Sequence, residues 1–161
     1  MVTSCDQQIM PVKNQPSILI VEDDENDILL IRRTLVRAGV PNRVASVTSA
    51  EAAIAYMAGQ DPYCNRDRSP FPGLVLLDLK MPGLNGFDVL TWIRRQPRFT
   101  SLRIVVVTSS RDIRDVTRAY HLGADSFLVK PFEFENANAL FNMLNAQGIW
   151  CQQTAPAVTC Q

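Results

Sequence analysis

Residues 74–83 read LVLLDLKMPG: an unbroken apolar run, then an aspartate, then a turn. Short apolar runs bounded by turn signals are typical of strands that are buried on both faces of a parallel sheet. Runs of the same kind occupy residues 18–21, 104–107 and 127–129. Their repetition predicts an α/β fold whose sheet contains at least these four strands.

A polar residue follows each of the four runs. The endings are Glu22-Asp23-Asp24, Asp78, Thr108 and Lys130-Pro131. In open α/β sheets, ligands bind in the crevice beyond the carboxyl ends of the strands. If the four strands are parallel neighbours, their acids, hydroxyl and ammonium converge on one crevice, and we expect a functional site there.

The segments between the runs have the pattern of amphipathic helices. Asp24 is the predicted N-cap of a helix that stops at Gly39, and Thr48 with Glu51 predicts a capping box for the next helix. The expected helices cover residues 26–38, 48–58, 86–94, 110–122 and 135–146, and a second strand covers residues 43–47. Five strands alternating with five helices, joined by right-handed crossovers, predict a parallel sheet with helices on both faces.

The composition fits one globular domain. The chain has 161 residues, 47% of them hydrophobic and 20% charged, and its 16 basic residues balance 16 acidic ones. Neither nucleic acid nor a membrane surface is therefore indicated as a partner. No apolar stretch approaches the roughly 18 residues of a spanning helix, and the first fifteen residues lack the features of a secretory signal, so we expect a cytoplasmic protein.

The four cysteines are scattered, and no two of them form a CxxC pair. They lie at positions 5, 64, 151 and 160, and His121 is the only histidine that could join them. This spacing argues against a zinc site or a disulfide scaffold and favours reduced thiols.

Three segments fall outside the strand–helix alternation. Residues 1–16 and 151–161 are predicted tails, which leaves residues 17–150 as the domain. Residues 59–72 are polar and rich in turn signals, so we expect an extended loop before the third strand. The loop is either a partner-binding loop or a tolerated surface insertion, and the sequence leaves both readings open.

The acidic strand endings predict a metal site. Asp78 alone could equally be a helix cap or turn former, and the turn after it is expected to expose its carboxylate. The acids at 22–24 lie one strand away, and carboxylates this close repel one another unless a cation is present. An all-oxygen ligand set favours Mg²⁺, which takes one or two carboxylates and completes its shell with water and phosphate oxygens.

Lys130 and Thr108 are the candidates for binding phosphate. In isolation, Lys130 could be a solvated charge and Thr108 a β-branched strand residue. Beside the acids, a lysine held by the following proline suits a phosphoryl group, and the threonine hydroxyl suits a phosphate oxygen.

These residues resemble the signature of the receiver domains of two-component response regulators, the superfamily of the chemotaxis response regulator. The resemblance covers residues 17–145 and rests on Val21-Glu22-Asp23-Asp24, Leu77-Asp78-Leu79-Lys80-Met81-Pro82-Gly83 with Gly86, Val107-Thr108-Ser109 and Lys130-Pro131. It implies a doubly wound, flavodoxin-like sheet of five parallel strands in the order 2-1-3-4-5.

The resemblance also implies the chemistry of the acids. Asp78 would be the phosphoacceptor. Glu22, Asp23 and Asp78 would hold Mg²⁺, and the carbonyl of Lys80 would be a further ligand.

A second group of residues would read out the phosphoryl group. The resemblance implies that Thr108 and Lys130 bind the phosphoryl oxygens. Phe127 would be the aromatic switch residue that rotates inward as Thr108 moves.

A narrower resemblance links the chain to the stand-alone regulators that are paired with bacterial phytochromes. It rests on the long loop, the segment at 71–82 and Trp150. Such regulators are often dimers through the fourth helix, the fifth strand and the last helix. Here that face would contain Ile113, Tyr120, Phe127, Phe134, Phe141 and Trp150, and the alternative is that most of these side chains belong to the core.

The predicted function is a single-domain response regulator. A sensor histidine kinase would phosphorylate Asp78 in a Mg²⁺-dependent reaction, and a conformational switch would signal through a downstream protein. A phosphorelay shuttle to a histidine phosphotransfer protein is one alternative. A phosphorylation-independent binding module is another, although such degenerate domains usually lose an acid or the lysine that this chain keeps.

An aspartate-based phosphohydrolase is the rival from the enzyme class. The haloacid-dehalogenase pattern needs a second aspartate two residues after the nucleophile, where Lys80 stands here. We therefore expect a signalling protein, not an enzyme, that catalyses only its own phosphorylation and dephosphorylation.

Overall fold

Five parallel strands form one sheet in the order β2-β1-β3-β4-β5. The structure, a computed structural model, describes residues 16–40 and 42–146. The strands are β1 (Ser17–Val21), β2 (Val44–Val47), β3 (Pro72–Leu77), β4 (Arg103–Thr108) and β5 (Ser126–Val129). The predicted flavodoxin-like strand order is confirmed.

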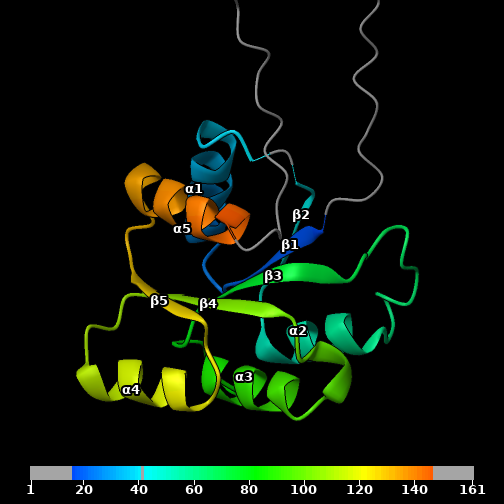
Figure 1. Ribbon diagram of the computed structural model, residues 1–161. Coiled ribbons are helices and arrows are strands. Elements are labelled where there is room, and N and C mark those ends of the chain that lie inside the picture. The colour runs from blue at the N-terminus through cyan, green and yellow to red at the C-terminus, as the bar shows by residue number, and fades with distance from the viewer. Residues whose placement is uncertain (1–15, 41, 147–161) are drawn as a thin grey trace, which may run out of the picture.

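Helices cover both faces of this sheet (Figure 1). They are α1 (Glu25–Arg37), α2 (Ala50–Ala58), α3 (Gly86–Arg94), α4 (Ile113–His121) and α5 (Phe134–Ala146), with a 3-10 turn, η1, at Pro97–Phe99. Helices α1 and α5 lie side by side on one face, and α2, α3 and α4 line the other (Figure 1). The expected doubly wound architecture is therefore present.

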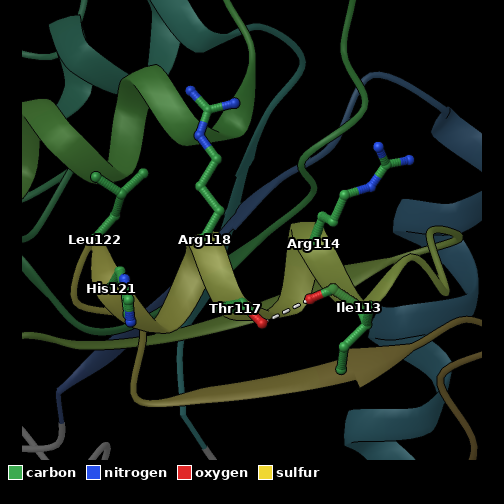
Figure 2. Close-up of a pocket in the computed structure, with 6 residues that line it drawn as sticks. All are labelled: Ile113, Arg114, Thr117, Arg118, His121 and Leu122. Atoms are coloured by element: carbon green, nitrogen blue, oxygen red, sulfur yellow. Dashed lines mark hydrogen bonds between the residues drawn. The ribbon is translucent and has the colours of Figure 1, made fainter.

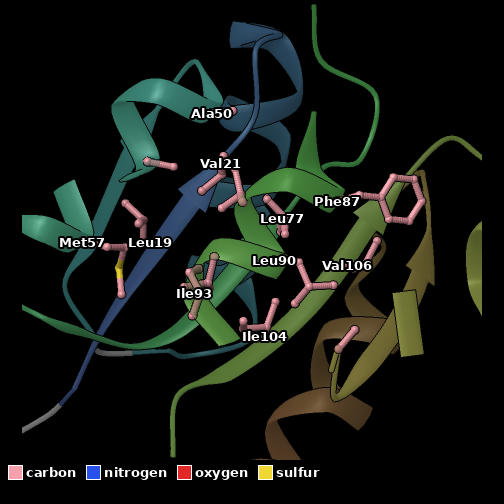
Figure 3. Close-up of a cluster of buried hydrophobic side chains, with 14 of the residues drawn as sticks. Leu19, Val21, Ala50, Met57, Leu77, Phe87, Leu90, Ile93, Ile104 and Val106 are labelled. Carbon is pink, nitrogen blue, oxygen red and sulfur yellow. The ribbon is translucent and has the colours of Figure 1, made fainter. Parts of the chain in front are cut away.

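Alternate side chains of the strands feed two hydrophobic cores. In β1, Leu19 and Val21 join the core beneath α2 and α3, and Ile18 and Ile20 join the core beneath α1 and α5. Figure 3 shows the first of these cores, where side chains of β1, β3 and β4 meet those of α2 and α3. Strands β1 and β3 are buried on both faces as predicted, and so is nearly all of β4.

Strand β5 departs from that prediction. Its four residues are all only partly buried, because β5 is the edge strand and has a neighbour, β4, on one side alone. The apolar run at 127–129 is thus a strand, as expected, but its residues stay partly exposed.

The helix starts confirm one capping prediction and correct another. Asp24 caps α1, since its side chain accepts a hydrogen bond of 2.8 Å from the Asn26 amide. The capping box at Thr48 was wrong: the N-cap of α2 is Ser49, whose hydroxyl accepts from the Ala52 amide at 3.0 Å. The helix begins at Ala50, so Ser49 and not Thr48 is the residue just before it, and the Ser49 hydroxyl reaches an amide of the first turn that has no partner within the helix.

The bounds of α3 are as predicted, but its cap and the start of α4 were not foreseen. A reciprocal capping box opens α3, where the Asn85 and Asp88 side chains each accept from the other residue's amide. Helix α4 begins at Ile113, three residues later than the expected Ser110, because Asp112 is its cap.

The loop at 59–71 is tied to the domain by two arginines. Arg43 donates to the carbonyls of Asp67 and Arg68 at 2.6 and 2.8 Å. Arg66 donates to the carbonyls of Tyr56, Met57 and Ser69, and its guanidinium lies 3.8 Å from the centre of the Phe71 ring. These hydrogen bonds give the loop a defined conformation. Its role as a partner-binding loop stays a prediction.

Both predicted tails lie largely outside the described residues, so the proposed boundaries of the domain stay untested. Over the part that the structure describes, none of the helices is both long and apolar enough to cross a membrane. Cys64 is a free and exposed cysteine. The other three cysteines lie outside the described residues.

Gly86 fixes the loop after β3 because only a hydrogen fits at its α-carbon. A Cβ placed there would lie 2.2 Å from the Asp78 carbonyl oxygen and 2.8 Å from the Leu79 α-carbon. The close approach lets the Gly86 amide donate to the Leu79 carbonyl at 3.2 Å. The start of α3 is thereby held against the residue that follows β3.

Substituting Gly86 with alanine should therefore lower the free energy of unfolding by about 2 kcal/mol or more, because backbone atoms cannot yield as side chains can. Urea denaturation measures this change. The matched control is Gly39→Ala, where φ is +72° but nothing lies within 4 Å. It should cost only about 1 kcal/mol from backbone conformation. Equal losses in the two variants would contradict the steric argument.

Candidate functional site

The polar strand endings meet at the carboxyl edge of the sheet, as predicted. Hydrogen bonds between neighbouring strands continue past the strand ends: the Asp78 amide donates to the Val21 carbonyl at 2.9 Å, and the Lys130 amide donates to the Thr108 carbonyl at 2.8 Å. The Glu22 amide likewise donates to Val47 at 3.1 Å. The backbone that carries these functional groups is as firmly fixed as the sheet itself.

Three carboxylates gather at this edge. Oxygens of Glu22, Asp23 and Asp78 all lie within 4.8 Å of one another. Glu22 and Asp78 are 2% and 4% exposed, whereas Asp23 faces solvent. The expectation that the turn after Asp78 exposes its carboxylate was wrong, because the neighbouring strand endings cover it.

Asp24 does not join this group. Its side chain turns back to cap α1, so the third acid of the Glu-Asp-Asp run has a structural role. The Glu22 carboxylate, in contrast, accepts the Asp24 amide at 3.1 Å and points into the site.

Lys130 is the centre of the acidic group. Its Nζ lies 2.5 Å from Glu22 Oε2, 2.8 Å from Asp27 Oδ2 and 3.3 Å from Asp78 Oδ2. The lysine side chain is only 15% exposed, which contradicts its reading as a solvated surface charge.

Asp27 is the site residue that the sequence analysis missed. It lies in the first turn of α1, where an acid is ordinarily explained by the helix dipole. What marks Asp27 as a site residue is its position one turn after Asp24, on the side of α1 where its carboxylate reaches Lys130. That orientation depends on tertiary packing, which the sequence pattern alone does not give.

The electrostatics of the site are those of an acid cluster short of positive charge. Burial raises the pKa of Glu22 to about 7, although the hydrogen bond from Lys130 works in the opposite direction. Burial also acts to lower the pKa of Lys130, but hydrogen bonds to Asp27 and Glu22 outweigh it, and the net direction is upward. The ammonium therefore stays charged and is shared among several acids.

The donor set suits a hard cation. Four carboxylates, those of Glu22, Asp23, Asp27 and Asp78, face one ammonium, so a second positive charge would be stabilised here. All three clustered ligands are carboxylate oxygens, which favour Mg²⁺ or a similar ion. The residues present thus fit a divalent metal.

The Asp78 carboxylate is held at both oxygens. Its Oδ1 accepts the Lys80 amide at 3.1 Å, and its Oδ2 accepts Lys130. Such a carboxylate cannot rotate freely, which orients it for reaction with a group arriving at the crevice. The predicted role of the Lys80 carbonyl as a metal ligand stays a prediction.

The two predicted switch residues lie on the β4–β5 side of the sheet, Thr108 at the end of β4 and Phe127 in β5. Thr108 is fully buried, and its hydroxyl oxygen accepts the Ser110 amide at 3.4 Å. Phe127 is partly buried and packs against the core beneath α2 and α3. They lie on adjacent strands but two positions apart in register, since Thr108 pairs with Val129 and Phe127 pairs with Val106. Their coupled movement stays a prediction.

Residues 18–143 match the model of the response regulator receiver domain. The chain belongs to this family. The match spans more than three quarters of the sequence and includes every strand ending described above.

Relatives of this receiver domain include regulators of phytochrome signalling systems. It is 32% identical to the response regulator Rcp1 of Synechocystis, over 87% of this chain and 92% of Rcp1. A solved structure of Rcp1 contains Mn²⁺; it has a TM-score of 0.69 at 27% identity and covers 87% of this chain and 96% of that one.

Two other solved structures are similar along nearly their whole length. The phosphorylated cyanobacterial phytochrome response regulator RcpA is 30% identical with a TM-score of 0.68, covering 88% of this chain and 97% of that one. The bacteriophytochrome response regulator RtBRR is 33% identical with a TM-score of 0.75, covering 89% and 84%. Receiver domains act in signalling, and this chain is related to those of phytochrome systems.

The shared ammonium makes Lys130 important for stability. Replacing Lys130 with methionine keeps the aliphatic stem but leaves buried carboxylates without their cation, and should cost about 3 kcal/mol of unfolding free energy. Urea denaturation at pH 8 in EDTA measures the loss. The control is Lys80→Met, whose side chain is 58% exposed and should change stability by less than about 1 kcal/mol. A Lys130 variant as stable as the control would show that the acids do not depend on the ammonium.

Proposed function

We propose that this receiver domain accepts a phosphoryl group on Asp78 from a sensor histidine kinase, in a reaction that depends on Mg²⁺. The observation that carries the proposal is the meeting of Asp78, Lys130 and the acids of β1 at one edge of the sheet. An oriented carboxylate, an adjacent ammonium and a metal-binding oxygen set are the parts that phosphoryl transfer to a carboxylate requires.

In the proposed transfer, a carboxylate oxygen of Asp78 attacks the phosphorus atom of a phosphohistidine. A P–O bond forms, the P–N bond breaks, and its electron pair returns to the imidazole nitrogen. Lys130, 3.3 Å from Asp78 Oδ2, would bind a phosphoryl oxygen. The Thr108 hydroxyl would donate to another, since it uses its oxygen and not its proton in the bond from Ser110.

Glu22, Asp23 and Asp78 would hold the Mg²⁺, with the Lys80 carbonyl as a further ligand. A bound dication would supply neutralisation of charge as the phosphoryl group approaches the acids. The existence of a Mn²⁺-bound form of Rcp1 supports the binding of a divalent ion by this chain.

The resulting acyl phosphate would act as a local electrostatic switch. Thr108 would move toward the phosphoryl group, and Phe127 would rotate inward into the space beside it. Because Phe127 lies on the edge strand β5, its movement would alter a surface that a partner can reach.

That surface includes the exposed side of α4. Ile113 is 72% exposed and Tyr120 is also exposed. Figure 2 shows the outer face of α4, where a depression of about 430 Å³ is lined by Ile113, Arg114, Thr117, Arg118, His121 and Leu122. At these exposures neither Ile113 nor Tyr120 belongs to the core, so both side chains are available for contact with a second protein.

The expected dimer face has four further residues, and the structure describes the side chains of two of them. Phe127 and Phe134 are partly buried. Trp150 and the side chain of Phe141 lie outside what the structure describes. We propose that the α4–β5 surface binds a downstream protein or a second copy of the chain, in a cytoplasmic pathway whose kinase is a bacterial phytochrome.

The acceptor is tested by Asp78→Asn. An amide is a far poorer nucleophile than a carboxylate, so this variant should take up no phosphoryl group from a small acyl-phosphate donor with Mg²⁺. Intact mass measures the uptake of one phosphoryl group per chain. Asp67→Asn, an exposed aspartate in the 59–71 loop, is the control and should be labelled like the parent chain. Labelling of the Asp78 variant at parental levels would refute the proposed acceptor.

The metal site is tested by thermal unfolding. At ten times its dissociation constant, Mg²⁺ should stabilise the fold by about 1.4 kcal/mol and raise Tm by about 5 °C. Asp23→Ala should remove most of this increment. Asp24→Ser is a matched control, because it deletes the neighbouring charge but keeps an N-cap for α1, and its increment should persist. A loss of equal size in both variants would point to general charge instead of a metal site.

A further inference from the structure

Lys80 and Asp115 join the acceptor loop to α4. Lys80 is two residues after Asp78, and its Nζ lies 3.0 Å from Asp115 Oδ2 in the first turn of α4. The backbone of Lys80 is anchored at the other end, since its amide donates to Asp78 Oδ1 at 3.1 Å. A single residue therefore contacts both the acceptor carboxylate and the start of α4.

A second set of hydrogen bonds links the site to the Asp115 carboxylate, through Thr108 and Ser110. The Ser110 hydroxyl donates to Asp115 Oδ2 at 2.6 Å, and the Ser110 amide donates to the Thr108 hydroxyl at 3.4 Å. The chain of contacts runs from Asp78 through Lys80 to Asp115, and back through Ser110 to Thr108. Both residues at the ends of this path are ones that the phosphoryl group would contact.

The two lysines beside Asp78 are held very differently. Lys130 is 15% exposed and shared among three carboxylates, whereas Lys80 is 58% exposed and has Asp115 as its partner. An ion pair this exposed is weak, so its ammonium can be transferred to a stronger anion nearby. Lys130 is a fixed cation, and Lys80 is a movable one.

We propose that Asp115 is a positioning residue that holds α4 to the unphosphorylated acceptor loop through Lys80. A phosphoryl group on Asp78, with about two negative charges, outcompetes the single charge of Asp115 for the Lys80 ammonium. Thr108 at the same time turns its hydroxyl toward the phosphoryl oxygens and weakens its bond from Ser110. The first turn of α4 thus loses both of its links to the site in one event.

The consequence is a phosphorylation-dependent loosening of the α4 surface. The helix begins at Ile113, the most exposed apolar residue of the depression in Figure 2, and Asp115 lies two residues later in the same first turn. At its far end α4 stays attached to α3, because the Arg118 guanidinium lies 4.2 Å from the centre of the Phe87 ring. Release of the first turn therefore changes the end of the surface where Ile113 lies. This inference rests on the proposed function, because it requires the phosphoryl group on Asp78.

Hydrogen exchange read by mass spectrometry over residues 110–120 tests the inference in the full chain. Beryllofluoride with Mg²⁺ serves as the phosphoryl mimic, and its binding is verified separately by fluorine NMR. In the parent chain the mimic should raise exchange of this segment about two- to fivefold, the change expected from loss of one partly exposed ion pair. Asp115→Asn should show the raised exchange already without the mimic, and little further change with it.

Lys80→Met reaches the same pair from the other side and should behave like Asp115→Asn, while Lys80→Arg should restore the response to the mimic. The matched control is Arg114→Gln. It breaks the 2.8 Å pair with Asp112 at the start of the same helix but leaves the Lys80–Asp115 ion pair in place, so the response should stay at the parental level. This set separates loss of the link from general weakening of α4.

The outcomes distinguish the inference from the function beneath it. Failure of the parent chain to bind the mimic would overturn both. Binding of the mimic together with a parental exchange response in Lys80→Met and Asp115→Asn would overturn the inference alone. Loss of the response in Arg114→Gln as well would equally overturn it, because the effect would then follow from helix stability and not from the Lys80–Asp115 contact.

Discussion

The Lys130 ammonium is the interaction on which the rest of the site depends. Buried carboxylates at the end of a sheet repel one another, and each ion removed from water carries a desolvation cost of several kcal/mol. One ammonium within 3.3 Å of Glu22, Asp27 and Asp78 makes the arrangement possible. It does not neutralise the arrangement, because the acids outnumber it. The fold thus holds an acidic pocket in a state that a divalent cation and a phosphoryl group can complete.

The sheet supplies the geometry that this balance needs. Glu22 and Lys130 are 108 residues apart in the sequence, yet their side chains touch because β1 and β5 end at the same edge. Amide–carbonyl bonds that continue beyond the strands fix Asp78 against Val21 and Lys130 against Thr108. Gly86 then presses the start of α3 onto the Asp78 backbone. Helices on both faces leave the carboxyl edge as the place where polar side chains can gather.

Much of this arrangement could be predicted from the sequence, because it depends on apolar runs and on the polar residues that follow them. Buried strands read as apolar runs, and the residue after each run had to lie at the common edge, which gave Glu22, Asp78, Thr108 and Lys130. What failed depended on tertiary contact. The burial of Asp78 comes from neighbouring strands, and the role of Asp27 comes from the rotation of α1 toward β5. The predicted cap at Thr48 was wrong because α2 begins one residue later than expected, which makes Ser49 the cap.

The two lysines beside Asp78 differ in how firmly they are held, and the proposed signalling role depends on that difference. Lys130 is held by three acids and would stay in place while it binds a phosphoryl oxygen on Asp78. Lys80 forms only a weak, exposed ion pair with Asp115. It would respond to a phosphoryl group on Asp78, because its contact with that group would be more favourable than its contact with Asp115. The same phosphoryl group would thus be stabilised through Lys130 and sensed through Lys80. The burial of the two side chains, 15% against 58%, is the physical basis of that division.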